Sequence, residues 1–81
     1  MMIKTFKGRP VKKQYELQPG VVRVILHEKD PTDTEPDPAK KRGIRFDVSS
    51  LEYKQNIGEV FFPDGAVRQT VIKELISKAR Q

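Results

Sequence analysis

A run of nine residues near the middle of the chain carries four acids and three prolines but no base. Positions 30–38 read Asp-Pro-Thr-Asp-Thr-Glu-Pro-Asp-Pro. Proline gives no N–H to a strand ladder and clashes inside a helix, so this run is neither a central strand nor a helix interior. We expect a long extended loop over 30–42 that ends in the basic cluster Lys40-Lys41-Arg42, with regular structure on either side.

The segment before this loop has the pattern of a β-hairpin. Residues 11–17 alternate, and the alternation puts on one face Val11, Lys13, Tyr15 and Leu17. Pro19-Gly20 suits a type II turn, because proline presets φ and glycine accepts a positive φ. Residues 21–28 are rich in β-branched side chains and predict a second strand. One face of that strand is expected to consist of Val22, Val24 and Leu26.

The segment after the loop predicts two further strands. Residues 43–49 alternate, with the core-facing side chains Ile44, Phe46 and Val48, and residues 59–62 form a short strand. The alternation breaks between them, over 49–57. Either a bulge interrupts a strand there, or Ser49 caps a short helix with Glu52 as its capping-box partner. The sequence leaves both possibilities open.

The C-terminal segment predicts an amphipathic helix over about 65–80, with Asp64 as its N-cap. Its apolar positions repeat at helical spacing and are Val67, Val71, Ile72, Leu75, Ile76 and Ala79. The predicted fold is therefore a single α+β domain, 1–81. It has a small, mostly antiparallel sheet of four to five strands, with the C-terminal helix packed on it.

The size of the chain limits its stability and its location. A domain of 81 residues buries a small core, and without cysteine no disulfide supports it, which favours a homodimer. No apolar run approaches the roughly 20 residues of a membrane span, and the first seven residues lack the apolar centre of a secretory signal. We expect a cytoplasmic protein.

The inventory of reactive residues argues against catalysis. A nucleophilic triad needs a nucleophile and a base, but the chain has no cysteine and a single histidine, His27. The acids of 30–38 lie on an exposed loop that lacks the central glycine and closing glutamate of a calcium loop. No glycine-rich phosphate cradle is present. We expect no enzymatic activity, no cofactor and no metal site.

The charge of the chain points to an anionic partner. The net charge is +5 and the isoelectric point about 9.7. Residues 1–13 carry five bases and no acid, and aromatic residues neighbour basic ones, an arrangement that suits stacking of single-stranded DNA or RNA on a sheet. The candidate nucleic-acid-binding residues are Lys4, Lys7, Arg9, Lys12, Lys13, Tyr15, Lys40, Lys41, Arg42, Arg45, Tyr53 and Lys54.

Other interpretations of the same features remain open. A net charge of this size also keeps a small domain soluble without any partner. The chain has the character of a small protein-interaction or regulatory module, for example a mobile-element accessory protein, acting through its helix or a strand edge. The acidic loop either neutralises the neighbouring basic cluster or mimics phosphate and shields it.

The stretch from Gly20 to Ile44 loosely resembles the hairpin of the positive-cofactor-four family of single-strand binders. The matching motifs are Val-x-Val-x-Leu at 22–26 and Lys-Arg-Gly-Ile at 41–44. Members of that family are strand-rich, end in a helix and are often dimers. Their helix follows the last strand almost directly, whereas here a strand around 59–62 intervenes, so we do not assign the chain to the family.

Overall fold

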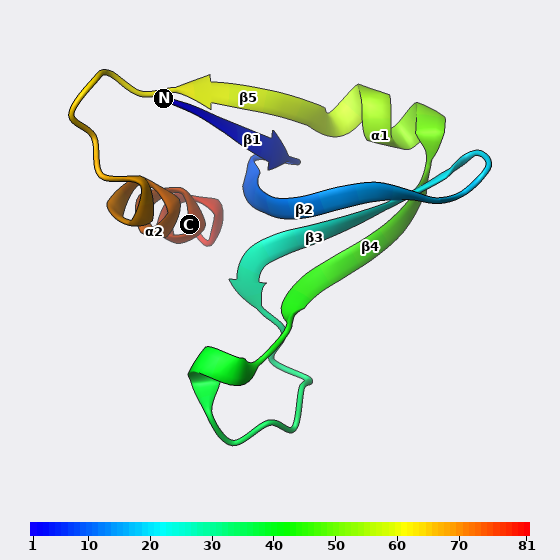
Figure 1. Ribbon diagram of the computed structural model, residues 1–81, viewed down its shortest axis with the longest axis horizontal. Helices are drawn as coiled ribbons and strands as arrows, with labels where there is room; N and C mark the ends of the chain where they lie inside the picture. Colours follow the sequence, from blue (N-terminus) through cyan, green and yellow to red (C-terminus); the bar gives the residue numbers. More distant parts are fainter.

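The computed structural model describes residues 1–81 and shows a five-stranded antiparallel sheet with a helix at its C-terminal end (Figure 1). The elements are β1 (Met2–Phe6), β2 (Arg9–Gln18), β3 (Val21–Lys29), the 3₁₀ helix η1 (Pro38–Lys40), β4 (Gly43–Ser49), α1 (Ser50–Asn56), β5 (Ile57–Phe61) and α2 (Arg68–Ala79). The predicted α+β class is confirmed. Neither α-helix has the length and apolarity needed to cross a membrane.

The order of the strands is β4-β3-β2-β1-β5, and β2 is the central strand. The start of β2 pairs with the end of β1, while the rest of β2 pairs with β3. Lys7 and Gly8 join β1 to β2 with positive φ angles of 52° and 79°, as a two-residue hairpin turn requires. Because β1 pairs with β5 on its other side, the basic N-terminal stretch begins with an interior strand of the sheet.

A bulge in β2 corrects the predicted faces of that strand. The register shifts between Val11, which lies opposite Leu26, and Lys13, which lies opposite Ile25. The extra residue reverses the alternation, so Val11 is buried whereas Lys13 and Tyr15 are exposed. The sequence pattern had placed all three side chains on one face.

The core lies on the concave side of the sheet. Its buried centre consists of Phe6, Val11, Val24 and Leu26, and the half-buried residues packed around it are Val22, Ile44, Phe46, Val48, Tyr53 and Ile57. The rings of Phe6 and Phe46 lie 6.0 Å apart between centroids. The predicted inward faces of β3 and β4 are thus confirmed. Helix α2 packs mainly against β2 and β3 and buries Val71 and Ile72.

Of the two structures that the sequence allows over 49–57, a bulged strand and a short helix, the protein forms the helix. Ser49 has extended backbone angles, and its hydroxyl oxygen accepts a hydrogen bond of 3.1 Å from the backbone N–H of Glu52. The Glu52 carboxylate does not complete a capping box, because it pairs with Lys7 Nζ at 3.3 Å. Helix α1 is therefore a single short segment held at its start by one side-chain cap.

Removing this cap has a measurable cost. Replacing Ser49 with alanine leaves a backbone N–H of the first turn of α1 without its acceptor, and we expect a loss of about 1 kcal/mol in the free energy of unfolding. Urea denaturation measures this loss. The matched control is Ser50→Ala, because the Ser50 side chain makes no hydrogen bond at this helix start. Equal losses in the two variants would rule out the capping role.

Helix α2 begins three residues later than predicted. The chain turns over residues 63–66, where Gly65 has φ +91° and the Ala66 N–H donates to the Pro63 carbonyl at 3.3 Å. Val67 occupies the N-cap position without a side-chain hydrogen bond, so Asp64 is not the cap. Pro63 and Gly65 favour a tight turn, and residues 65 and 66 belong to this turn and not to the helix.

A buried carboxylate ties α2 to the sheet. The Glu28 side chain, on β3, is only 2% exposed, and Arg9 Nε of β2 lies 2.9 Å from its Oε1 atom. Arg80 Nε, just after α2, lies 3.7 Å from Oε2. The two guanidinium groups compensate a charge that would otherwise be costly to bury.

Candidate nucleic-acid interface

The convex face of β2, β3 and β4 carries a basic and aromatic surface. Lys13 and Arg45 are both cross-strand partners of Ile25, one from each side. Lys13 Nζ lies 5.4 Å from the centroid of the Tyr15 ring, which is 39% exposed. The structure therefore brings together three of the predicted residues, Lys13, Tyr15 and Arg45, on one exposed face.

Two cross-strand rows form this face, Lys13–Ile25–Arg45 and Tyr15–Arg23–Asp47. Their single carboxylate, Asp47, already binds Arg23. Asp47 accepts two hydrogen bonds from Arg23, at 2.7 Å from Nε and 3.0 Å from Nη2. These bonds hold the pKa of Asp47 below its usual range. The third Arg23 nitrogen, Nη1, donates to the Tyr15 hydroxyl at 3.4 Å and so helps to orient the ring. The charge of Asp47 is therefore largely offset by Arg23, and the charges of Lys13 and Arg45 remain unpaired.

A second group of basic residues lines a hollow between the end of β3 and α2. His27 and Lys29 lie farther along β3 than Arg23 and Ile25, where the pairing of β3 with β4 becomes irregular. The hollow has a volume of about 280 Å³, and its lining includes Lys12 of β2, His27 and Lys29 of β3, and Lys73 of α2. Apolar side chains and Gly43 form the rest of its wall together with Gln69, and no carboxylate lines it.

The pKa of His27 reflects its position in the hollow. Its burial lowers the pKa of the imidazole below the usual range, and the charges of Arg68, Lys12 and Lys29 lower it further. The Nε2 atom is buried and has no hydrogen-bond partner. Burial and the three neighbouring cations therefore both disfavour the protonated form of the ring.

Two of the remaining predicted residues pair with acids. Lys7 Nζ lies 3.3 Å from Glu52, and Arg9 pairs with the buried Glu28. Tyr53, predicted to be a stacking residue, packs against the core instead.

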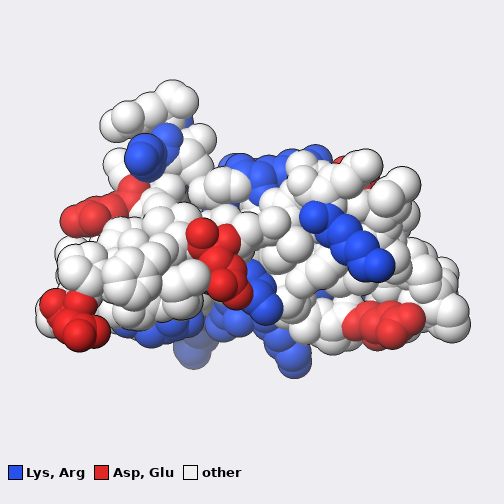
Figure 2. All heavy atoms as spheres, turned by 90° about the horizontal axis from the view of Figure 1, so that it is seen from above, with Lys and Arg blue, Asp and Glu red and all other residues white.

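The predicted lysines Lys4 and Lys54 lie on β1 and α1, away from the convex face. Figure 2 looks onto the side of the molecule that carries β5 and α1. On that side, basic and acidic side chains are interspersed with uncharged surface, so it presents no continuous basic face.

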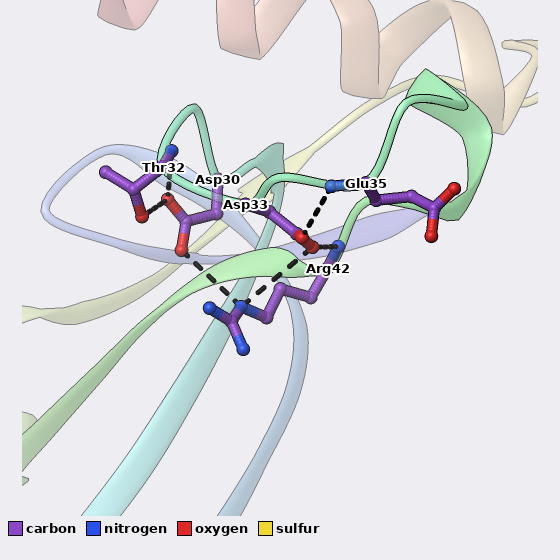
Figure 3. Close-up of polar contacts among 5 residues, drawn as sticks. All are labelled: Asp30, Thr32, Asp33, Glu35 and Arg42. Atoms are coloured by element: carbon purple, nitrogen blue, oxygen red, sulfur yellow. Dashed lines mark hydrogen bonds and ion pairs between the residues drawn. The ribbon is translucent and has the colours of Figure 1, made fainter.

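The predicted cluster 40–42 is partly neutralised by the acidic loop (Figure 3). Arg42 Nε lies 3.7 Å from Asp30 and 4.0 Å from Asp33, and Asp33 also accepts the Arg42 backbone N–H at 3.0 Å. Thr32 donates two hydrogen bonds to Asp30, which lower the pKa of that carboxyl group. Arg42 thus links the end of the loop to acids near its start, in line with the interpretation that the acidic loop neutralises the neighbouring basic cluster. Lys40 and Lys41 form no ion pair.

The balance of ion pairs identifies the surface with the most uncompensated charge. Of the sixteen Lys and Arg residues, five pair with a carboxylate, namely Lys7, Arg9, Arg23, Arg42 and Arg80, and eleven do not. Five of these eleven lie on the convex face or line the hollow, and a sixth, Arg68, lies near enough to His27 to lower its pKa. We call this surface the basic track, and its residues are Lys12, Lys13, Tyr15, Lys29, Arg45, Arg68 and Lys73.

Three members of the basic track were not among the predicted residues. Lys29 and Lys73 line the hollow, and Arg68 lies close enough to His27 to lower its pKa. Their sequence neighbours give no signal, because Lys29 adjoins the acidic run and the other two lie on the polar side of a helix. Only the packing of α2 against β2 and β3 brings them beside Lys12.

No family model, no curated protein and no solved structure matches this chain.

Proposed function

We propose that the protein is a small non-enzymatic binding protein that contacts single-stranded nucleic acid through the basic track. The observation that supports this most directly is that six cations without a carboxylate partner lie on the convex face and at the hollow, with the exposed Tyr15 ring beside Lys13. Phosphate groups supply the missing counter-ions, and release of the ions condensed on the nucleic acid drives the binding.

The dimensions and chemistry of the track suit a single strand. From Arg23 to Lys29 the convex face extends along β3 for about 20 Å, at roughly 3.3 Å per residue. Tyr15 lies near one end with its ring steadied by Lys13 and Arg23, and it offers a surface on which a base stacks. The lysines of the hollow lie near the other end and attract the backbone. Nothing in this arrangement reads a particular base, so we expect little sequence preference.

Removing the lysines of the hollow is expected to weaken binding and its dependence on salt. In the variant Lys12→Ala/Lys29→Ala/Lys73→Ala, up to three phosphate contacts are lost. The slope of log affinity against log salt then falls by about two units, since each neutralised phosphate of a single strand contributes about 0.7. Fluorescence anisotropy with a labelled oligothymidylate at several salt concentrations measures both quantities.

The control removes the same charge elsewhere. Lys4→Ala/Lys40→Ala/Lys54→Ala also deletes three lysines that have no carboxylate partner, but from three separate elements, β1, η1 and α1. Its salt slope is expected to stay near that of the unmodified protein. Equal slopes in the two triple variants would show that only net charge matters, and absence of binding at 50 mM salt would disprove the proposed function.

A second candidate function rests on the edge formed by β5. Phe61 and Met2 are cross-strand partners and are 67% and 50% exposed, beside a strand with no neighbour on its outer side. Such an edge suits addition of a strand from a protein partner or from a second copy. The helix α2 offers less apolar surface for this role, because its residues Val71 and Ile72 are buried in the fold. Light scattering of Phe61→Lys beside the unmodified protein tests self-association.

A further inference from the structure

The hollow beside α2 differs from the rest of the basic track because it is concave and lined from three sides. Lys12 comes from the bulge of β2, Lys29 from the end of β3 and Lys73 from the second turn of α2. None of the three forms an ion pair, and the wall contains no acid. Three lysine side chains that line one space from three elements are suited to bind a multiply charged anion.

The size and the remaining lining of the hollow favour a compact tetrahedral oxyanion. A volume of about 280 Å³ exceeds that of a single phosphate group, so the anion enters with part of its hydration or with the atoms attached to it. Gln69 of α2 adds an amide that donates to oxygen, whereas Leu26, Ile72 and Ile76 provide an apolar floor. The low polarity of that floor strengthens the attraction between the lysines and an anion.

We infer that this hollow is a discrete phosphoryl-binding site, in which Lys12, Lys29 and Lys73 hold one backbone phosphate of the bound strand. The inference rests on the proposed function, since it takes the anion to be part of a nucleic acid. Free inorganic phosphate offers the same chemistry, so the experiment below separates the two sources. Lys29 and Lys73 give the anion opposing contacts from the sheet and the helix.

His27 couples this site to pH. The charged groups that lower its pKa are Lys12 on β2, Lys29 on its own strand and Arg68 on α2. Lys73 of α2 lines the same hollow, and the β4 residue in the lining is the uncharged Gly43. An anion in the hollow offsets these charges, so it raises the pKa of His27 back toward the usual range. By linkage, the anion binds more tightly when the pH is lowered through the range in which His27 titrates.

The sign of the stability change follows from the same pKa. Without an anion, the pKa of His27 is lower in the folded state than the usual value of about 6.5 in the unfolded chain. As the pH falls below about 6.5, the unfolded chain therefore binds more protons than the folded state, and the free energy of unfolding decreases. A bound anion returns the pKa of His27 toward its unfolded value. The loss of stability is therefore expected to be smaller in the presence of the anion.

The test uses the single histidine as its own reporter. We expect inorganic phosphate, added at constant ionic strength, to shift the His27 ring signals in NMR spectra until they saturate, and to raise the pKa obtained from their titration. Sulfate, which does not titrate in this range, keeps the charge of the anion fixed in a parallel series. Lys73→Gln is expected to weaken phosphate binding about tenfold, because one charge-assisted contact is lost. The matched control Lys54→Gln, on α1, leaves it unchanged.

A second titration, with an oligothymidylate that lacks terminal phosphates, distinguishes the possible outcomes. We expect it to shift the same His27 signals and to be displaced by phosphate. If His27 responds to phosphate only as it does to sodium chloride of equal ionic strength, the site does not exist, even if the oligonucleotide binds elsewhere. If phosphate binds but the oligonucleotide leaves His27 unmoved, the backbone phosphate is the wrong ligand. If phosphate binds and the oligonucleotide does not bind at all, the proposed function fails while the oxyanion site stands.

Discussion

Replacing Gly43 with alanine is expected to lower the free energy of unfolding by about 3 kcal/mol, one of the two largest single-residue effects expected in this fold. A β-carbon built at Gly43 would overlap the backbone carbonyl oxygen of Leu26, and it would also lie 3.1 Å from Cγ2 of Ile25. A backbone atom of a paired strand cannot move aside alone, so β3 and β4 must separate at the start of β4. Thermal and urea unfolding measure the loss.

The control for this prediction is another strand glycine with more room. A β-carbon at Gly58, in β5, meets only the Thr5 hydroxyl oxygen at 3.3 Å, which a small adjustment relieves. Gly58→Ala is therefore expected to change stability by less than about 1 kcal/mol. If the two alanine variants were equally stable, the close approach of β4 to β3 at Gly43 would be disproved.

Removing the Arg9 guanidinium is expected to cost a similar amount. In Arg9→Met the Glu28 carboxylate, 2% exposed, keeps only the more distant Arg80. A buried charge that loses its main partner destabilises a fold by about 3 kcal/mol, which lowers the melting temperature of a domain of this size by more than about 10 °C. Calorimetry of the single variant measures the change.

Two comparisons separate the pairing from the loss of the arginine side chain itself. Arg80→Met is expected to have a much smaller effect, because the Arg80 side chain is 64% exposed and lies farther from Glu28. The double variant Arg9→Met/Glu28→Leu is expected to recover most of the stability, since it removes the buried charge together with its partner. A double variant less stable than Arg9→Met would contradict the burial of an uncompensated carboxylate as the cause.

Local patterns were sufficient to predict most of the elements. The β-branched run of β3 and the alternation of β4 determine which side chains face inward, because burial of one face fixes the register of a strand. The proline-rich run correctly marks a loop that interrupts the β3–β4 pair. The choice between a bulge and a helix over 49–57 needed tertiary information, since both local patterns satisfy the polar groups of Ser49 and Glu52.

Apart from the start of α2, which a local turn delays, the features that the sequence did not reveal depend on contacts between distant segments. The bulge at Lys12 exists only relative to β3, yet it decides that Lys13 and Tyr15 face outward while Val11 is buried. The interior position of β1 likewise depends on β5, at the other end of the sheet.

The candidate site was predictable only in part for the same reason. Lys12, Lys13, Tyr15 and Arg45 were identified from charge and aromatic neighbours, and the structure gathers them in or beside one face. The lysines that complete the hollow come from β3 and α2, whose proximity no local motif encodes.

The pairing of β1 with β5, in which Met2 lies opposite Phe61, has a consequence for the order in which the sheet assembles on a ribosome. The meander of β2, β3 and β4 is made of neighbours and is able to form as soon as its residues emerge. β1 must wait for β5, and until then the outer row of its backbone N–H and C=O groups is open to other strands. The nascent chain therefore passes through a stage in which its first strand is an unpaired edge of the sheet.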